Sequence, residues 1–246
     1  DLFNTYVFQV PPDSDIKKIC QLYEDDPHVE FAQPDYVMAA TVFPNDPPDD
    51  PAYTSVWALN NTGQTGGTSD ADMDAPEAWP KDLVDGVVVA VVDTGVDYNH
   101  EDVSANIWSN TDETGGNGVD DDGNGFIDDI RGWDFVNNDN DPADLVDGHG
   151  TFVAGNVAAV TNNGLGVASI APQAKIMPLK GLDDSGLGFS SDLANAIVYA
   201  AMYGADVINN SWGCSTPCPS DPTAETAVRT AHCLGSLIVF AAGNSA

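Results

Sequence analysis

Residues 86–95 read Gly-Val-Val-Val-Ala-Val-Val-Asp-Thr-Gly. The six residues from Val87 to Val92 are apolar without interruption, which is typical of a strand buried on both faces of a parallel sheet. Asp93 follows this run directly. Because open α/β sheets place their ligand sites beyond the carboxyl ends of the strands, this aspartate is a candidate for chemistry.

Strand-like and helix-like segments alternate after this run. Further strands are predicted at residues 174–179, 205–209 and 237–242, the last of them buried. Helices are predicted at residues 151–160, from a cap at Ser190 or Ser191 up to Gly204, and at residues 222–234. This alternation predicts an α/β fold with a doubly wound, mostly parallel sheet.

A small α+β unit is predicted at residues 1–43. Strand candidates at residues 6–10 and 29–32 enclose a short helix that Asp13 or Ser14 caps. Residues 44–51, Pro-Asn-Asp-Pro-Pro-Asp-Asp-Pro, are expected to form an extended linker. The larger domain then spans residues 52–246. Because its last predicted strand is followed by a single turn, we expect the chain to be a fragment.

The charge of the chain argues against two classes of binding partner. The 246 residues include 39 acidic and 7 basic side chains, a net charge of −32, and 42% are hydrophobic. Such a field repels nucleic-acid phosphates and anionic membrane surfaces, so neither is an expected partner. There is no apolar run of about 18 residues, the length that a membrane-spanning helix needs. Most of the acids are aspartates, which favour loops, turns and calcium sites.

The four cysteines, Cys20, Cys214, Cys218 and Cys233, are too few for a dense disulfide scaffold. A disulfide among the last three is expected in an oxidising compartment. Buried free thiols are the alternative, and the pairing stays open.

Three polar residues stand at strand ends or helix starts: Asp93, His149 and Asn244. A carboxylate, an imidazole and an amide donor at one edge are the parts of an acyl-transfer site. Taken singly, each has a simpler interpretation: a helix cap, a loop histidine and a residue in a left-handed turn.

The surrounding residues resemble the subtilisin-like serine proteases. Four motifs occur in the order that the family shows: Val-Val-Asp-Thr-Gly-Val-Asp at 91–97, Gly-His-Gly-Thr-Phe-Val-Ala-Gly at 148–155, Ala-Asp-Val-Ile-Asn-Asn-Ser-Trp-Gly at 205–213 and Ala-Ala-Gly-Asn at 241–244. Asp-Ala-Pro-Glu-Ala-Trp at 74–79 belongs to the same set. Residues 1–43, notably residues 27–36, resemble the second half of the inhibitory propeptide of these enzymes.

The resemblance implies a secreted, monomeric endopeptidase that hydrolyses protein substrates and is inhibited by its own propeptide. Asp93 would orient His149 and stabilise its protonated form, His149 would act as general base and then general acid, and Asn244 would donate to the oxyanion. Two segments would pair with the substrate backbone. They are Gly186, Leu187 and Gly188, and Ser211, Trp212 and Gly213.

Two positions depart from the family pattern. Phe152 stands where the family usually has a second histidine, so we expect altered packing there. The nucleophile is the graver case, because the family's Gly-Thr-Ser-Met-Ala-like motif is matched only by residues 67–71, Gly-Thr-Ser-Asp-Ala, which precede Asp93. We expect Ser69 not to be the nucleophile and the chain alone not to form an acyl-enzyme. The alternatives are a pseudoprotease that binds peptides and calcium, or a purely calcium-binding module.

Calcium is the expected cofactor. Residues 112–147 contain eleven aspartates, Glu113 and a single base, Arg131, so their carboxylates repel one another unless cations bind. The simpler interpretation is a hydrated acidic surface without bound ions. Asp120, Asp122 and Asn124 follow a D-x-D-x-N-G spacing, with Asp128 and Asp129 close behind. By resemblance to calcium segments of the family, two further ligand sets are implied: Asp134, Asn137 and Asp139; and Asp50, Asp102, Thr161, Asn163, Leu165 and Val167.

Overall fold

The computed structural model describes residues 8, 10–11, 14–29, 32, 47–79, 86–214 and 220–244. The chain divides into two compact units, Asp1–Thr41 and Val42–Ala246. In the first, helix α1 (Ile16–Glu24) begins after Asp15, whose side chain accepts a hydrogen bond from the N–H of Lys18 (3.2 Å). The cap is therefore neither Asp13 nor Ser14. The strands predicted at 6–10 and 29–32, and the linker at 44–51, lie partly outside the described residues.

The second unit is built on one parallel sheet. Its strands are β1 (Val88–Asp93), β2 (Trp133–Asp134), β3 (Lys175–Lys180), β4 (Val207–Asn210) and β5 (Leu237–Phe240). They lie in the order β2-β3-β1-β4-β5, and every pairing is parallel. The predicted α/β fold is confirmed, with the Val87–Val92 run at its centre.

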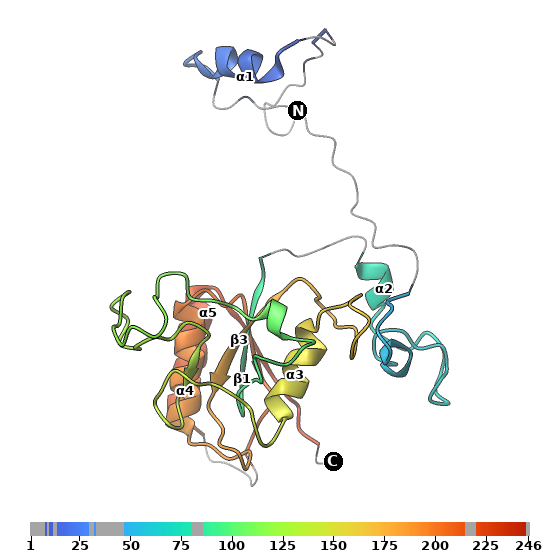
Figure 1. Cartoon of the computed structure of the whole chain (residues 1–246), viewed down its shortest axis with the longest axis vertical. Coiled ribbons are helices and arrows are strands. Elements are labelled where there is room, and N and C mark those ends of the chain that lie inside the picture. Colours follow the sequence, from blue (N-terminus) through green and yellow to red (C-terminus); the bar gives the residue numbers. More distant parts are fainter. Residues whose placement is uncertain are drawn as a thin grey trace. The chain divides into compact units, whose positions relative to one another are not determined.

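Helices cover both faces of this sheet, as Figure 1 shows. Helix α3 (His149–Ala158) packs on one face, where Ala154 and Ala158 meet Val89 and Val91. Helix α4 (Ser190–Met202) packs on the other, against Ala90 and Val92, and helix α5 (Pro222–Leu234) packs against α4 and β5. Successive residues of β1 thus serve opposite cores, which explains why the whole strand is apolar. Short helices lie at Ala75–Ala78 (α2), Tyr53–Ser55 (η1) and Ser104–Asn106 (η2).

The structure corrects two further predictions, both in the larger unit. Strand β5 was expected to be buried, but Leu237, Val239 and Phe240 are exposed, because β5 is the edge strand among the described residues. Helix α4 is preceded by Phe189 in an extended conformation, not by a capping serine, since Ser190 is already its first helical residue.

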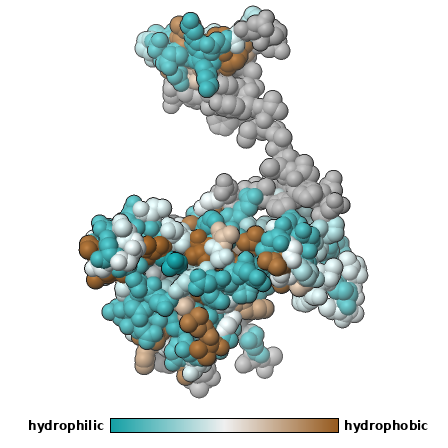
Figure 2. All heavy atoms as spheres, in the orientation of Figure 1, coloured by the Kyte–Doolittle hydropathy of each residue, from teal (hydrophilic) through white to brown (hydrophobic). Residues whose placement is uncertain are grey.

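The face of the larger unit that Figure 2 shows is mostly teal, and therefore polar, with scattered brown apolar areas. Within the described residues, no helix is both long enough and apolar enough to cross a membrane. Cys214 forms a disulfide, whereas Cys20 and Cys233 carry free thiols. Cys233 is therefore not the partner of Cys214, and Cys218 lies outside the described residues.

Candidate active site and cation sites

The carboxyl end of β1 brings Asp93 to the first residue of α3. Nδ1 of His149 lies 2.7 Å from Oδ1 of Asp93, although 56 residues separate them in sequence. The Asp93 side chain is fully buried, whereas the His149 side chain is 46% exposed. A carboxylate that holds one ring nitrogen leaves the other, Nε2, available for proton transfer.

A close approach of two backbone segments sets this geometry. A Cβ on Gly150 would lie 1.9 Å from the carbonyl oxygen of Gly95, so only glycine fits there. The N–H of Gly150 donates to Oγ1 of Thr94 (3.0 Å), and the N–H of Thr94 donates to Asp93 (2.7 Å). The first turn of α3 is thereby held against the loop after β1.

The environment shifts the pKa values of both groups. The hydrogen bond with Asp93 raises the pKa of His149, and the charges of Asp93, Asp147 and Asp144 add to the rise, while desolvation opposes it. Burial raises the pKa of Asp93, and hydrogen bonds from His149 and Thr94 act against that rise. The raised pKa of His149 favours an imidazolium beside Asp93, which is the charge state that a general base reaches after taking a proton.

The two candidate substrate segments follow the strands on either side of β1. Gly186, Leu187 and Gly188 lie in the turn after β3, and Ser211, Trp212 and Gly213 follow β4. The turn after β3 is fixed to Asp93, whose carbonyl oxygen accepts from the N–H groups of Gly181 and Leu182 (both 3.0 Å). Leu187 itself is 64% exposed. Since β1 lies between β3 and β4, both segments border the edge that carries Asp93.

Sequence reasoning missed a buried cation at this edge. Lys180 is the last residue of β3, and its Nζ donates to the carbonyl oxygen of Thr94 (2.7 Å) and to Asp184 (2.8 Å). It joins the loop after β1 to the turn that contains the first substrate segment. The alternating strand pattern gives no signal for such a contact, because it depends on the pairing of β1 with β3.

Asn244 and Ser69 lie in different surroundings. Asn244 is exposed and follows β5, so it stands at the same carboxyl edge of the sheet as Asp93. The hydroxyl of Ser69 donates to the carbonyl oxygen of Asn61 (3.4 Å), within the loop before α2. Across the described part of the chain, no serine hydroxyl is hydrogen-bonded to His149. Phe152, the departure from the histidine motif, is 71% exposed.

The loop at residues 161–167 meets two buried carboxylates. Oδ2 of Asp102 accepts from the N–H of Val167 (2.9 Å), and its Oδ1 accepts from the side chain of Asn163 (2.8 Å). Asp50 accepts from the N–H of Asn162 (2.9 Å). A Cβ on Gly166 would lie 2.0 Å from Oδ2 of Asp102. Of the residues predicted as one ligand set, Asn163 and Val167 therefore bond to Asp102, and Asp50 accepts from the same loop. Thr161 and Leu165 belong to this loop, where they bond to Ser169 and Asn163.

A second cluster of oxygens lies in the acidic segment, defined as residues 110–129. Glu113, Asp120 and Asp122 have carboxylate oxygens within 4.8 Å of one another, close enough to share one cation. The two aspartates were predicted as ligands, but Glu113 was not, because it lies upstream of the D-x-D-x-N-G motif. Asp128 does not join this group, since its oxygens accept from the N–H groups of Asn117 and Gly118.

Two other residues of the acidic segment, Asn124 and Asp129, hold it together through hydrogen bonds. The amide of Asn124 donates to Asp122 and to Asp129 (both 3.0 Å), and its oxygen accepts from the N–H of Phe126. Asp129 is fully buried and also accepts from the hydroxyl of Tyr199 in α4. The segment is thus anchored to α4 through Asp129, one of the two aspartates that follow the D-x-D-x-N-G motif.

The third predicted set begins at Asp134, the last residue of β2. Asp134 is buried and accepts from the N–H groups of Val136 and Asn137 and from the side chain of Asn137. Burial raises the pKa of Asp134, and the charge of Asp139 adds to the rise. Asp134 and Asp139 also pair through their backbones. The three predicted residues therefore lie in one tight turn, in which the side-chain amide of Asn137 donates a hydrogen bond to the Asp134 carboxylate.

Comparison with known proteins gives consistent matches. Residues 84–246 match the model of the Subtilase family, Peptidase_S8. A thermophilic serine proteinase of Bacillus sp. (strain AK1) is 36% identical over 238 residues, which cover 97% of this chain and 50% of that protein. An extracellular protease of Xanthomonas campestris pv. campestris is 37% identical over 236 residues, which cover 90% of this chain and 38% of the other.

A solved structure shows the same fold. A protease from Pseudoalteromonas arctica PAMC 21717 superimposes with a TM-score of 0.63 at 32% identity, and the match covers 81% of this chain and 60% of that one. The chain spans 50% of the length of the Bacillus relative and 38% of the length of the Xanthomonas relative.

Proposed function

The chain belongs to the subtilase family, and from this premise we propose that the full-length protein is a serine-type endopeptidase that hydrolyses peptide bonds in proteins. The observation that carries the proposal is the 2.7 Å contact between Nδ1 of His149 and the buried carboxylate of Asp93. A solvent-exposed histidine gains this fixed orientation only because two distant segments converge on it.

The roles follow from the chemistry of acyl transfer. His149 Nε2 takes the proton of a serine hydroxyl as that oxygen attacks the substrate carbonyl carbon, and then gives the proton to the leaving amine. Asp93 stabilises the imidazolium that forms in between. The amide of Asn244 donates to the oxyanion of the tetrahedral intermediate. The serine is assigned to the part of the relatives' length that this chain does not span, since Ser69 is engaged elsewhere.

Substrate binding is assigned to the segments at 186–188 and 211–213. An extended peptide that runs between them would gain main-chain hydrogen bonds on both sides, as an added strand does. The order β3-β1-β4 supports this assignment, because both segments follow strands that flank β1, whose carboxyl end carries Asp93.

Calcium is the proposed cofactor, and the residues fit it. Calcium is a hard cation that prefers six to eight oxygen ligands, mixing carboxylates, amides and carbonyls. Glu113, Asp120 and Asp122 would hold one ion, and Asp50, Asp102 and Asn163 with the carbonyls of Thr161, Leu165 and Val167 would hold another. Bound calcium would neutralise carboxylates that repel one another and so stabilise the two loops. Asp134, Asn137 and Asp139 are a third candidate set.

The remaining assignments rest on resemblance and on relatives. Residues 1–43 are proposed to be the C-terminal part of an inhibitory propeptide, a zymogen arrangement in which the protein's own segment blocks the site. Secretion is proposed because the Xanthomonas relative is named an extracellular protease and because Cys214 is disulfide-bonded. A monomeric state is proposed from the family resemblance alone.

The test uses the protein expressed from its complete reading frame. A fluorophosphonate probe labels only an activated serine, and hydrolysis of a protein substrate is followed in parallel. We expect labelling and cleavage by the wild type, and neither by His149→Ala, with Glu101→Gln as an exposed control. A wild-type protein that binds peptide aldehydes or calcium without labelling or cleavage would instead be a non-catalytic pseudoprotease.

A further inference from the structure

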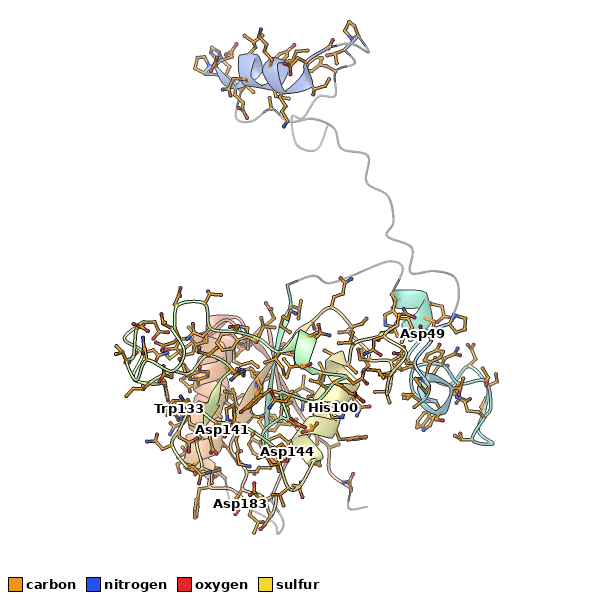
Figure 3. All side chains as sticks on the ribbon, in the orientation of Figure 1. Asp49, His100, Trp133, Asp141, Asp144 and Asp183 are labelled. Atoms are coloured by element: carbon orange, nitrogen blue, oxygen red, sulfur yellow. The ribbon has the colours of Figure 1, made fainter. Side chains whose placement is uncertain are left out.

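One buried carboxylate near the site has no role in the scheme above. Asp144 lies in the loop before α3 and is only 4% exposed. Its Oδ1 accepts from the N–H of Gly148 (2.9 Å), and its Oδ2 accepts from the N–H and the hydroxyl of Thr151 (3.0 and 2.9 Å). These residues enclose His149 on both sides in sequence. Figure 3 labels Asp144 together with Asp183, which follows β3, in the lower part of the larger unit.

The contacts of Asp144 extend to the loop after β1. The hydroxyl of Thr151, which donates to Asp144, also accepts from the N–H of Asp97 (2.8 Å). In the same loop, the N–H of Val96 donates to the carbonyl oxygen of Pro142 (2.9 Å). Three segments therefore meet at one carboxylate: the loop that follows Asp93, the loop at residues 142–148, and the first turn of α3.

This arrangement replaces an ordinary helix cap. The residue that precedes α3 is Gly148, in a left-handed conformation and without a side chain that could accept the free N–H groups of the first turn. Asp144 supplies the missing acceptor from four residues upstream. A cap at Gly148 itself would point at the helix alone, whereas Asp144 reaches the helix and, through Thr151, the strand-end loop.

We propose that Asp144 is a positioning residue for His149, because its buried carboxylate locks the first turn of α3 to the loop after β1 and so sets the contact between His149 and Asp93. Its relevance to catalysis rests on the proposed peptidase function. Its effect on the position of His149 does not rest on that function, because the contact between His149 and Asp93 is present in this chain.

A purely electrostatic role is the competing explanation. The charged groups that act on His149 are Asp93, Asp147 and Asp144. Asp147 is exposed, and its side chain makes no hydrogen bond within the described residues. It therefore serves as a control for charge without positioning. The variants Asp144→Asn and Asp144→Glu separate the two properties: the first keeps the size and loses the charge, and the second keeps the charge but displaces it.

The experiment follows the Nδ1 proton of His149 by NMR in the full 246-residue chain, which contains only four histidines. The signal is assigned by its loss in His149→Gln. We expect Asp144→Asn and Asp144→Glu both to abolish the signal, or to speed its exchange at least about 10-fold, and to lower the pKa of His149. Asp147→Asn should keep the signal. Wild-type behaviour of either Asp144 variant would overturn the proposal.

A second pair of variants covers the case in which Asp144 variants unfold, as judged by circular dichroism. Thr151→Val removes the hydroxyl that joins Asp144 to Asp97, and Thr151→Ser retains it. Loss of the Nδ1 signal in the valine variant alone supports the proposal, and identical spectra of the two variants overturn it.

Activity is measured separately in the protein from the complete reading frame. There, Asp144→Asn should lower kcat about 100-fold with little change in KM, as expected when a catalytic group is misplaced by about 1 Å. A wild-type protein without peptidase activity would contradict the proposed function, while the NMR result would still decide the role of Asp144.

Discussion

The Asp93–His149 pair and the acidic segment at residues 110–129 both depend on carboxylates, but they are built in opposite ways. The pair is fixed by β1 and α3, and its carboxylate faces an imidazole that can carry the opposite charge. The acidic segment contains no helix or strand, and its carboxylates mainly accept hydrogen bonds from nearby N–H groups and amides.

This difference predicts different failures. The pair is positioned by packed backbone, so its side chains can change without loss of the fold. In the acidic segment the carboxylates themselves are the framework, and Glu113, Asp120 and Asp122 converge without a basic partner among the described residues. Substitutions in the Asp93–His149 pair should mainly reduce activity, and substitutions in the acidic segment should mainly reduce stability.

The sharpest test of this contrast is Asp93→Asn in the protein from the complete reading frame. We expect kcat to fall about 10⁴-fold, the size measured for the corresponding aspartate in serine proteases, because the imidazole loses its orienting acceptor. The urea midpoint should change little, since asparagine keeps an acceptor for Thr94 and buries no charge. A large loss of stability with retained activity would contradict the contrast.

The next effect concerns Asn244. Replacing it with alanine should lower kcat about 10²- to 10³-fold with a smaller change in KM, a magnitude known from the oxyanion asparagine of a subtilisin. The exposed Asn156 on α3 provides a control, and Asn156→Ala should hydrolyse a peptide substrate at the wild-type rate. Equal rates for both variants would remove Asn244 from the site.

Calcium removal should affect the other region. Transfer from calcium at 100 times its Kd into chelator should destabilise the fold by about 2.7 kcal/mol per site, because only the folded state binds the ion. Glu113→Gln should abolish the share that belongs to the acidic segment, and the exposed neighbour Asp112→Asn should not. Urea unfolding with and without calcium measures both, and identical calcium dependence in the two variants would argue against the Glu113 site.

The smallest expected effect is the pH dependence that His149 contributes. Its pKa is raised in the folded state above about 6.5, so its protonation stabilises the fold. That contribution is complete below the unfolded pKa and is lost as the pH rises through the folded pKa. The urea midpoint of the wild type should therefore exceed that of His149→Gln most at acid pH. A gap that widens toward alkaline pH would reverse the sign.

Deprotonation of His149 should increase activity, although it removes the stability that the protonated form contributes. Because the general base must be neutral, the acidic limb of the kcat/KM profile should lie above pH 6.5. The limb should move to lower pH in Asp147→Asn, which removes one charge that favours the imidazolium.

Local patterns predicted much of the fold because they reflect local physics. Helix α5 spans Pro222–Leu234 as predicted, since Asp221 caps it and Gly235 ends it. Helix α3 was predicted to start at Thr151, two residues late, because its acceptor is Asp144 and not a neighbouring cap. The exposure of β5 was not predicted either, because an apolar run does not show whether a strand is central or at the edge.

The sequence by itself determined the alternation of strands and helices, the motifs around Asp93, His149 and Asn244, and the acidic character of residues 110–129. These are properties of residue type and spacing along one segment. Only the tertiary structure decided that Asp144 joins α3 to the loop after β1, that Lys180 reaches Thr94, and that Glu113 joins Asp120 and Asp122. The physical reason is that such contacts depend on strand order and loop path, and neither is encoded in the spacing of residues within a single segment.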